Sequence, residues 1–264
     1  MKRSIEDTPI VLIGAGNLAT NLAKAIYRKG FRIVQIYSQT EESAKLLANK
    51  VEADYTTNLD EVVTTAKLYV VALKDAVLAE LLPRIVANKP DALFVHTAGS
   101  LPMNIFEGLA TRYGVFYPMQ TFSKQREADF KDIPIFLEAN SEENLTFLKA
   151  IASTLSPNVH VATSEQRKSL HLAAVFICNF TNHMYVLAAD LLQKNDLPFE
   201  VMLPLIDETA RKVHEIKPID AQTGPAMRYD ENVINNHLSM LESDPALHDI
   251  YKLLSKSIHE HHQL

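Results

Sequence analysis

The sequence predicts an α/β fold, a doubly wound and mostly parallel sheet, followed by an all-helical C-terminal domain. Apolar runs typical of buried parallel strands alternate with helical patterns in the first part of the chain. A glycine-rich turn follows the first of these runs. No convincing strand pattern occurs after Thr163, where long helical patterns begin. We therefore expect two domains, over residues 1–162 and 163–264.

The first predicted strand, 9–13, leads directly into Gly14-Ala15-Gly16-Asn17-Leu18-Ala19, which fits the pattern G-x-G-x-x-[GA]. A helical pattern to Gly30 and a second apolar run, 31–37, follow. This order is that of a dinucleotide-binding unit, because the glycines let the backbone approach a pyrophosphate and the helix N-terminus offers unpaired N–H groups. We expect Gly14, Gly16, Asn17 and Leu18 to bind the cofactor. The alternative is a tight turn without a ligand.

The end of the second strand bears on which dinucleotide is bound. NAD sites usually carry an acidic residue there, which binds the ribose hydroxyls. Here the strand tip reads Ser38-Gln39-Thr40, and Glu41 and Glu42 fit the first turn of the next helix. Small hydroxyls are able to hydrogen-bond a 2′-phosphate, although no Arg lies at the tip. The tip therefore favours NADP over NAD.

The other elements of the first domain follow in alternation. Helices are expected over 42–50, 59–65, 76–86, 104–113 and 141–155, and strands over 67–73, 92–96, 114–117, 133–138 and 158–162. A short strand or turn is expected over 54–58. The continuously apolar run 67–73 is typical of a strand buried on both faces. Pro134 favours an edge position for the strand 133–138. Ser141 is expected to cap the helix that follows it.

The second domain begins with a capping box, Thr163-Ser164-Glu165-Gln166. A long helix without Pro or Gly is expected from there to about Gln193, and its apolar residues surround much of its circumference, so it must be covered on several sides. Further helices are expected over 198–216, with a possible bend at Pro204, and over 230–242 and 245–259. A helix this apolar suggests that a second copy supplies part of the core, which predicts a homodimer.

Composition excludes several classes of protein. The formal net charge of −6 gives no electrostatic support for a nucleic-acid partner. A single cysteine, Cys178, excludes an internal disulfide framework. No apolar run is expected to reach the length of a membrane span, and the N-terminus shows no signal-peptide pattern. We expect a soluble, cytoplasmic protein that binds a small molecule, with no membrane or nucleic-acid partner and no metal site.

Three segments are expected to meet at the carboxyl edge of the sheet, where open α/β sheets bind their ligands. They are 73–75, 96–100 and 117–121. From them we expect Leu73, Lys74, Thr97 and Gly99 to contact the cofactor and Ser100 to contact the substrate. The alternatives are a solvated loop with a helix cap at Lys74-Asp75 and a simple strand-to-helix turn at 97–100.

His171, Asn179 and Asn182 are polar residues on the long apolar helix. In a regular helix about three turns separate His171 from Asn182, which places them on nearly the same face, with Asn179 one turn before Asn182. Buried polar groups need partners, which a substrate or the nicotinamide amide would supply. We expect His171 as a general acid, Asn179 to orient the substrate and Asn182 to contact it. The alternative is a structural role at an interface.

Arg228 lies in a polar turn, 223–230. Its guanidinium is suited to bidentate binding of a substrate carboxylate. A structural ion pair with Asp230 is an equal alternative.

Several blocks of the chain resemble a known family. They are Tyr37-Ser38-Gln39-Thr40, His96-Thr97-Ala98-Gly99-Ser100, Tyr117-Pro118-Met119-Gln120-Thr121-Phe122, His171-Leu172-Ala173-Ala174-Val175 with Asn179, Thr223 to Asp230, and His237-Leu238. Together they look like the Rossmann-like proteins with a DUF2520 C-terminal domain, described as NADP oxidoreductases and similar in layout to pyrroline-5-carboxylate reductase and the 6-phosphogluconate and 3-hydroxyacid dehydrogenases. The resemblance covers nearly the whole chain. It implies a Rossmann domain, a helical dimerisation domain and a nicotinamide cofactor, but no particular substrate.

The chain departs from the pattern of these families at three positions. Gln39 stands where many relatives have an Arg for the 2′-phosphate, and Tyr117 stands where a His is common. The related dehydrogenases carry a Lys on the corresponding helix, and the long helix here has no Lys between His171 and Gln193.

We therefore expect an NADP-dependent oxidoreductase that transfers a hydride between the nicotinamide and a small polar or carboxylate-bearing substrate. The alternative is an NADP-binding sensor or scaffold without turnover, which the missing Lys favours. The sequence names neither the substrate nor the direction of the reaction.

Overall fold

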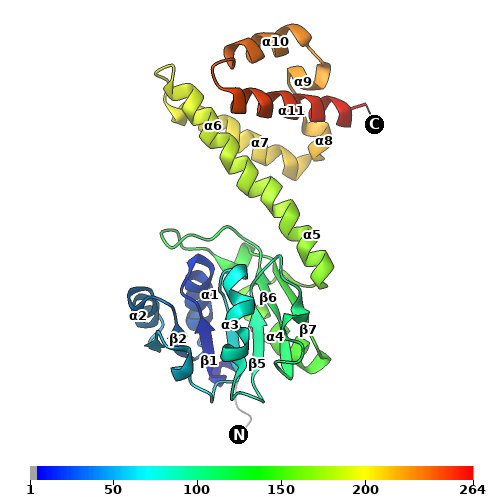
Figure 1. Ribbon diagram of the computed structural model, residues 1–264. Helices are drawn as coiled ribbons and strands as arrows, with labels where there is room; N and C mark the ends of the chain where they lie inside the picture. Colours follow the sequence, from blue (N-terminus) through cyan, green and yellow to red (C-terminus); the bar gives the residue numbers. More distant parts are fainter. Residues whose placement is uncertain (1–4, 264) are drawn as a thin grey trace. The chain divides into compact units, whose positions relative to one another are not determined.

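The structure, a computed structural model, describes residues 5–263 (Figure 1). The chain divides into two compact units, Met1–Cys178 and Asn179–Leu264, each of which is described by itself. This division falls inside the long helix, whereas the boundary predicted after residue 162 marks the end of the last strand. The domain boundary after residue 162 therefore stays a prediction.

The first unit is built on an eight-stranded sheet with the order β3-β2-β1-β4-β5-β6-β7-β8. The strands are β1 Ile10–Ile13, β2 Ile33–Tyr37, β3 Asp54–Thr56, β4 Leu68–Val71, β5 Leu93–His96, β6 Arg112–Pro118, β7 Ile135–Ala139 and β8 Val159–Val161. All neighbouring strands run parallel except β6 and β7. The doubly wound, mostly parallel sheet is therefore confirmed.

Helices cover both faces of this sheet (Figure 1). They are α1 Asn17–Arg28, α2 Glu41–Lys50, α3 Asp75–Val86 and α4 Glu142–Leu155, with short 3-10 turns η1 Ile5–Asp7, η2 Leu59–Glu61, η3 Met103–Phe106 and η4 Phe130–Asp132. The Ser141 hydroxyl caps α4 by accepting a hydrogen bond from the Asn144 amide at 3.2 Å, as predicted.

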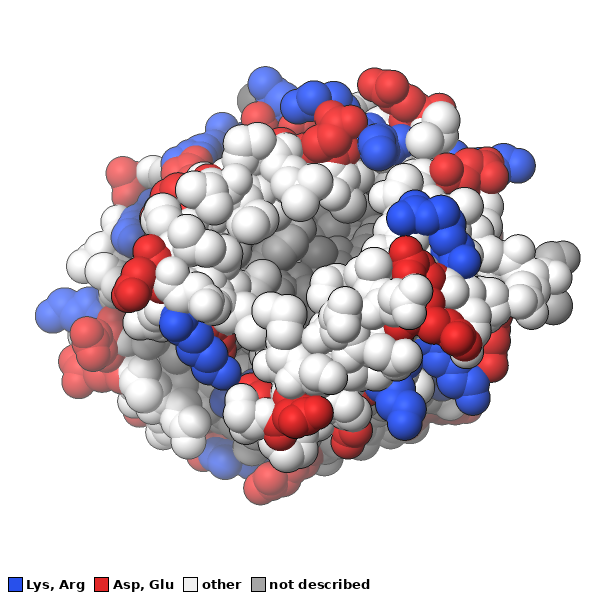
Figure 2. Space-filling model, turned by 90° about the horizontal axis from the view of Figure 1, so that it is seen from above, with Lys and Arg blue, Asp and Glu red and all other residues white. Residues whose placement is uncertain are grey.

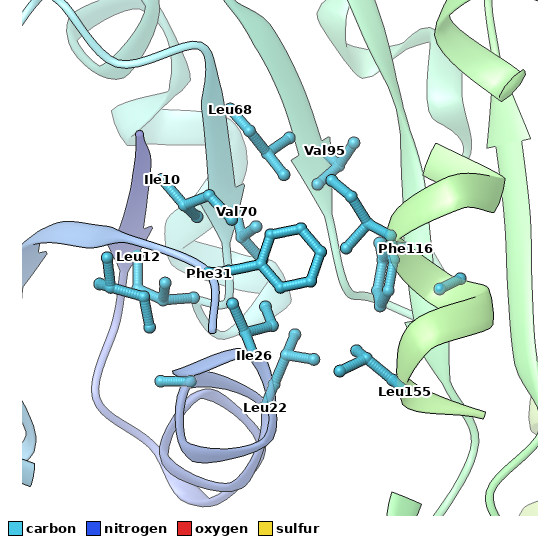
Figure 3. Packing of buried hydrophobic residues seen from close by; sticks show 14 of the residues in the cluster. Ile10, Leu12, Leu22, Ile26, Phe31, Leu68, Val70, Val95, Phe116 and Leu155 are labelled. Atoms are coloured by element: carbon cyan, nitrogen blue, oxygen red, sulfur yellow. The ribbon is translucent and has the colours of Figure 1, made fainter. Parts of the chain in front are cut away.

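The alternation of side chains along each strand divides the apolar core into two layers. In β1, Ile10 and Leu12 point into the layer beneath α1, α2 and α4, while Val11 and Ile13 point into the layer beneath α3. Figure 3 shows the first layer, where Phe31 packs among side chains of β1, β4, α1 and α4. Each fully buried aliphatic side chain contributes about 1.5–3 kcal/mol, so both layers hold the sheet in place.

Three predicted elements of this unit differ from the structure. The helix expected over 104–113 is wrong, because only η3 forms before Gly108, whose φ of +75° ends it, and pairing with β5 extends β6 back to Arg112. The edge position predicted for the strand at 133–138 is also wrong. Pro134 precedes β7, which pairs with both β6 and β8. The helix over 59–65 shrinks to the single turn η2.

The long helix predicted from Thr163 to Gln193 is present, in three parts: α5 Ser164–Ala174, the π-helical segment η5 Val175–Phe180, and α6 Thr181–Gln193. Its capping box is present as predicted, because the Thr163 hydroxyl accepts from the Gln166 amide and the Gln166 side chain accepts from the Thr163 amide. The sequence pattern did not predict the π-helical segment. Such segments are rare and often occur at functional sites.

Within the described residues, this helix is long and apolar enough to cross a membrane by length and composition. The expectation that no apolar run of the chain reaches the length of a membrane span is therefore wrong for this helix.

The second unit is helical, as predicted. After α6 it contains η6 Phe199–Met202, α7 Leu203–Glu215, α8 Pro218–Ala221, α9 Pro225–Arg228, α10 Glu231–Met240 and α11 Pro245–His261. Pro204 lies in the first turn of α7 and does not bend a longer helix, because Pro is well accommodated where no backbone donor is needed.

The two glycines of the turn after β1 differ in what a side chain would meet. A Cβ atom at Gly14 would lie 2.4 Å from the Ala72 carbonyl oxygen, and its φ is +122°, whereas nothing lies within 4 Å of a Cβ at Gly16. We expect Gly14→Ala to lower the free energy of unfolding by about 1–3 kcal/mol or more. Gly16→Ala should change it by less than about 0.5 kcal/mol. Equilibrium urea unfolding checks this, and equal losses in both variants would contradict it.

Candidate active site

The carboxyl ends of three central strands lie level with one another. Ile13 of β1 is paired with Val71 of β4, which is paired with His96 of β5. The next residues continue this register, because the Ala72 amide donates to the Ile13 carbonyl at 2.8 Å and the Thr97 amide donates to the Val71 carbonyl at 3.2 Å. The turns that begin at Gly14, Leu73 and Thr97 therefore lie next to one another, as the sequence analysis expected.

The turn at Gly14 leaves the start of α1 open. Gly14 fits against Ala72 only because it has no side chain, and its amide donates to the Tyr37 carbonyl at 2.8 Å. Gly16 is the N-cap of α1 and offers no side-chain cap, so the first-turn amides near Asn17 and Leu18 keep their capacity to bind an anion. This arrangement fits a pyrophosphate group.

The tip of β2 presents two exposed side chains next to the start of α2. Ser38 is nearly buried, and its amide donates to the Thr56 carbonyl at 3.2 Å. Gln39 and Thr40 are exposed, and Thr40 is the N-cap of α2 without a capping hydrogen bond from its hydroxyl. The Thr40 hydroxyl and the backbone amides at the N-terminus of α2 are hydrogen-bond donors suited to a phosphate group.

The turn after β4 is joined to the turn after β5. Lys74 is exposed and is the N-cap of α3, to which its side chain contributes no cap. The Ser100 hydroxyl donates to the Asp75 carboxylate. The two segments predicted to contact cofactor and substrate are thus in direct contact with each other.

His96, at the end of β5, is fully buried, and sequence reasoning did not select it. Its Nδ1 accepts the Ala98 amide at 3.1 Å, and its ring stacks on Phe106 with 5.9 Å between centroids. Burial, together with the positive charge of Arg167, lowers the pKa of His96 to about 3. A neutral imidazole therefore shapes the turn at Thr97–Gly99.

Arg167 is the residue that attaches the long helix to this turn, and sequence reasoning missed it. Its side chain is only 1% exposed. The guanidinium donates to the Ala98 carbonyl at 3.2 Å, to the Leu101 carbonyl and to the Glu138 carboxylate of β7. Glu138 also accepts from the Ser164 amide at 3.0 Å and from its hydroxyl at 2.8 Å. The first turn of α5 is thereby held against the sheet.

His171 lies one helical turn beyond Arg167 and packs on the turn after β5. A Cβ atom at Gly99 would lie 2.6 Å from His171 Nδ1, so the ring rests directly on the glycine backbone. The same nitrogen lies 3.3 Å from the Tyr117 hydroxyl at the end of β6. The structure thus brings His171 to the sheet edge together with Gly99 and with Tyr117 of the segment 117–121.

Three predicted site residues belong to the second unit, so their relation to the sheet edge stays a prediction. Asn179 and Asn182 are exposed there. The rule that related them to His171 assumed a regular α-helix, and the π-helical segment Val175–Phe180 breaks that assumption because its turns are wider.

Arg228, the third of these residues, is exposed. No ion pair between Arg228 and Asp230 is found within residues 5–263. Asp230 instead caps α10 by accepting from the Val233 amide at 3.3 Å. The structural alternative for Arg228 is therefore not observed, and its side chain keeps its capacity to bind a carboxylate.

The buried ion pair supports a prediction about stability. Arg167→Met leaves Glu138 without its cation, and we expect a loss of about 3–5 kcal/mol in the free energy of unfolding. The double variant Arg167→Met/Glu138→Gln should recover part of this loss, because no unpaired charge remains. Lys168→Met removes the exposed pair with Glu165 and should change stability by less than about 1 kcal/mol. Urea unfolding compares the stability of these three variants with that of the wild type. An Arg167→Met variant as stable as the wild type would contradict the role of Arg167.

Comparisons with known proteins agree with this architecture. Residues 9–99 match the family described as "NADP oxidoreductase coenzyme F420-dependent", and residues 133–258 match DUF2520, a domain of unknown function. The crystal structure of the "putative NADP oxidoreductase BF3122 from Bacteroides fragilis" is 74% identical, with a TM-score of 0.94 over 97% of this chain and 100% of that chain. No curated protein matches the sequence.

Two more distant structures share the fold. An imine reductase from Myxococcus stipitatus in complex with NADP+ is 16% identical, with a TM-score of 0.67 over 96% of this chain and 92% of that chain. A 1-pyrroline-5-carboxylate reductase from Streptococcus pyogenes is 12% identical, with a TM-score of 0.66 over 97% of this chain and 99% of that chain. Because of the 74% identical relative and the two family matches, the chain belongs to the family of NADP oxidoreductases that combine a Rossmann domain with a DUF2520 domain.

Proposed function

We propose that the protein is an NADP-dependent oxidoreductase that transfers a hydride between the nicotinamide and a small polar or carboxylate-bearing substrate. The observation that carries the proposal is the position of His171, which rests on Gly99 at the same sheet edge as the Gly14 turn. An ionisable group beside a dinucleotide-binding turn is what a hydride transfer coupled to proton transfer requires.

The residues at the sheet edge fit the parts of NADP in order. Gly14, Gly16 and the first-turn amides of Asn17 and Leu18 would hold the pyrophosphate. The 2′-phosphate would lie at the tip formed by Ser38, Gln39 and Thr40. The nicotinamide end would lie against four residues that follow β4 and β5, namely Leu73, Lys74, Thr97 and Gly99. When bound, the nicotinamide supplies or accepts the hydride.

The protein itself must supply or accept a proton, and we assign this role to His171. Reduction of a C=N or C=O bond consumes one hydride and one proton, and an imidazole exchanges protons near neutral pH. We assign Ser100, in the turn after β5, to the substrate. We also assign Asn179, Asn182 and Arg228 to the substrate, with Arg228 as the partner of a carboxylate.

The names of the more distant relatives suggest which substrates to test first. An imine reductase and a pyrroline-5-carboxylate reductase both act on C=N bonds by their names. The description of the matching family adds coenzyme F420, a deazaflavin, as a hydride partner. Cyclic imines, keto acids, hydroxy acids and a deazaflavin therefore form the first screen.

We further propose that the active protein is a homodimer formed through its helical part. The long helix and α7 expose large apolar side chains, among them Leu172, Ile177, Val186, Leu203, Leu205 and Val213. In the view from above, wide areas of the surface carry neither Lys, Arg, Asp nor Glu (Figure 2). Such an apolar surface favours association with another copy.

A protein partner fits the long helix better than a lipid bilayer does. The N-terminal end of the helix is held to the sheet through the buried guanidinium of Arg167. Farther along, Asn179, Asn182 and His183 would place polar groups within the bilayer, where they are expensive. The cytoplasm, with its supply of NADPH, suits such an enzyme.

The function is tested first by cofactor binding and then by turnover. Wild-type protein should bind NADPH more tightly than NADH and oxidise it with a substrate from the screen. His171→Ala should bind NADPH within about twofold of the wild-type Kd but lose on the order of 100-fold in turnover. Lys168→Ala, on the same helix, is the matched control and should keep both. Fluorescence titration and the absorbance of the reduced nicotinamide measure the two quantities.

The possible results separate the candidate functions. Absence of NADPH binding by the wild type would reject the proposed function. Binding without turnover across the whole screen would favour the sensor, which the missing Lys on the helix supports. Unchanged turnover in His171→Ala would reject His171 as the acid.

The dimer is tested at an exposed apolar position. Ile177, which is 74% exposed in the single chain, should be buried between copies, so Ile177→Glu should shift the protein from dimer to monomer. Leu46→Glu on α2, where Leu46 is 52% exposed, should leave the dimer intact. Sedimentation equilibrium measures the mass of each, and a wild-type monomer would contradict the proposal.

A further inference from the structure

Tyr117 is a buried hydroxyl group at the sheet edge that the proposed hydride transfer does not yet use. It lies near the C-terminal end of β6 and is 7% exposed. Its hydroxyl oxygen is 3.3 Å from His171 Nδ1, and the two rings meet edge to face with 6.4 Å between centroids. The residue therefore touches the group that we assign as the proton donor.

The sheet holds Tyr117 in a fixed position. β6 is paired with β5 on one side and with β7 on the other, where Tyr117 lies opposite Phe136. The ring also packs against Phe136, with 6.4 Å between centroids. Pro118 follows directly and restricts the backbone of Tyr117 to extended conformations. His171 thus meets a hydroxyl on a rigid support.

The contacts distinguish the two ring nitrogens of His171. Nδ1 is the atom that lies against Gly99 and Tyr117. Nε2 has no hydrogen-bond partner within the part of the chain that the structure describes. A hydroxyl that donates to Nδ1 fixes the neutral ring in the tautomer that carries its proton on Nε2. Nε2 is then the nitrogen that is able to give a proton to a substrate.

We propose that Tyr117 is a positioning residue that forms a two-group proton relay with His171, an inference that rests on the proposed function. In the direction of reduction, the substrate carbon receives the hydride and its electron pair, and the π electrons of the C=N or C=O bond move to the heteroatom. That heteroatom takes the proton from Nε2 of His171. The Tyr117 hydroxyl gives its proton to Nδ1, and the resulting phenolate regains a proton from water.

Burial and nearby charges have opposite effects on the Tyr117 phenolate that this relay requires. Burial raises the pKa of Tyr117, while the nearby Arg167 guanidinium opposes part of that rise. Arg167 is itself paired with Glu138, and burial keeps His96, which also feels the charge of Arg167, neutral. The phenolate is therefore a brief species, stabilised by the cation one helical turn before His171.

The relay is tested without a substrate by ¹⁵N NMR of the histidine rings in the whole protein, with His171→Gln used to assign the His171 signals. In the wild type we expect the Nε2–H tautomer, with Nδ1 as a hydrogen-bond acceptor. Tyr117→Phe should lose this preference and show a mixture of tautomers. Tyr113→Phe, at the opposite end of β6, is the matched control and should keep the wild-type spectrum.

Turnover gives a second readout once the screen has found a substrate. Tyr117→Phe should lower kcat on the order of tenfold, leave the KM for NADPH within about twofold, and shift the pH profile, whereas loss of packing alone would not move the profile. An unchanged His171 tautomer in Tyr117→Phe would overturn the relay even in an active enzyme. Failure of the proposed function would appear separately, as absence of NADPH binding by the wild type.

Discussion

The guanidinium of Arg167 is the interaction on which the candidate site depends. A buried cation must have both a counter-charge and hydrogen-bond acceptors, and Arg167 finds them in Glu138 and in the carbonyls of Ala98 and Leu101. These partners come from β7 and from the turn after β5. One side chain thus joins the start of the long helix to two parts of the sheet, and His171 follows one turn later.

The candidate site also depends on two glycines, which allow close contacts because they have no side chain. At Gly14 the backbone approaches Ala72 so closely that a Cβ atom does not fit, and at Gly99 the ring of His171 occupies the space of a Cβ atom. The first contact shapes the turn that leads into α1, and the second lets an ionisable ring lie directly on the loop after β5. Both glycines therefore serve the geometry of the sheet edge, although only Gly14 has a positive φ.

Much of the site could be predicted because its residues follow strands directly. Gly14, Lys74 and Gly99 come just after apolar runs, and parallel strands bring their carboxyl ends to one edge. Tyr117 and Arg167 were missed for opposite reasons. Tyr117 lies in the segment 117–121 that was expected at this edge, but its side chain was singled out only as a departure from a family pattern. Arg167 reads as an ordinary exposed residue in the first turns of a helix. Only the fold shows that each has a partner at His171 or Glu138.

Local sequence patterns were sufficient to predict the class of fold, the glycine turn, the capping box at Thr163 and the long apolar helix, because each depends on residues close together in the chain. The predictions of a helix over 104–113 and of an edge position for the strand 133–138 were wrong, since strand pairing over long separations decided both. The tertiary structure alone decided that His171 rests on Gly99 beside Tyr117. Such contacts join residues from separate elements, and local periodicity carries no information about which of them meet.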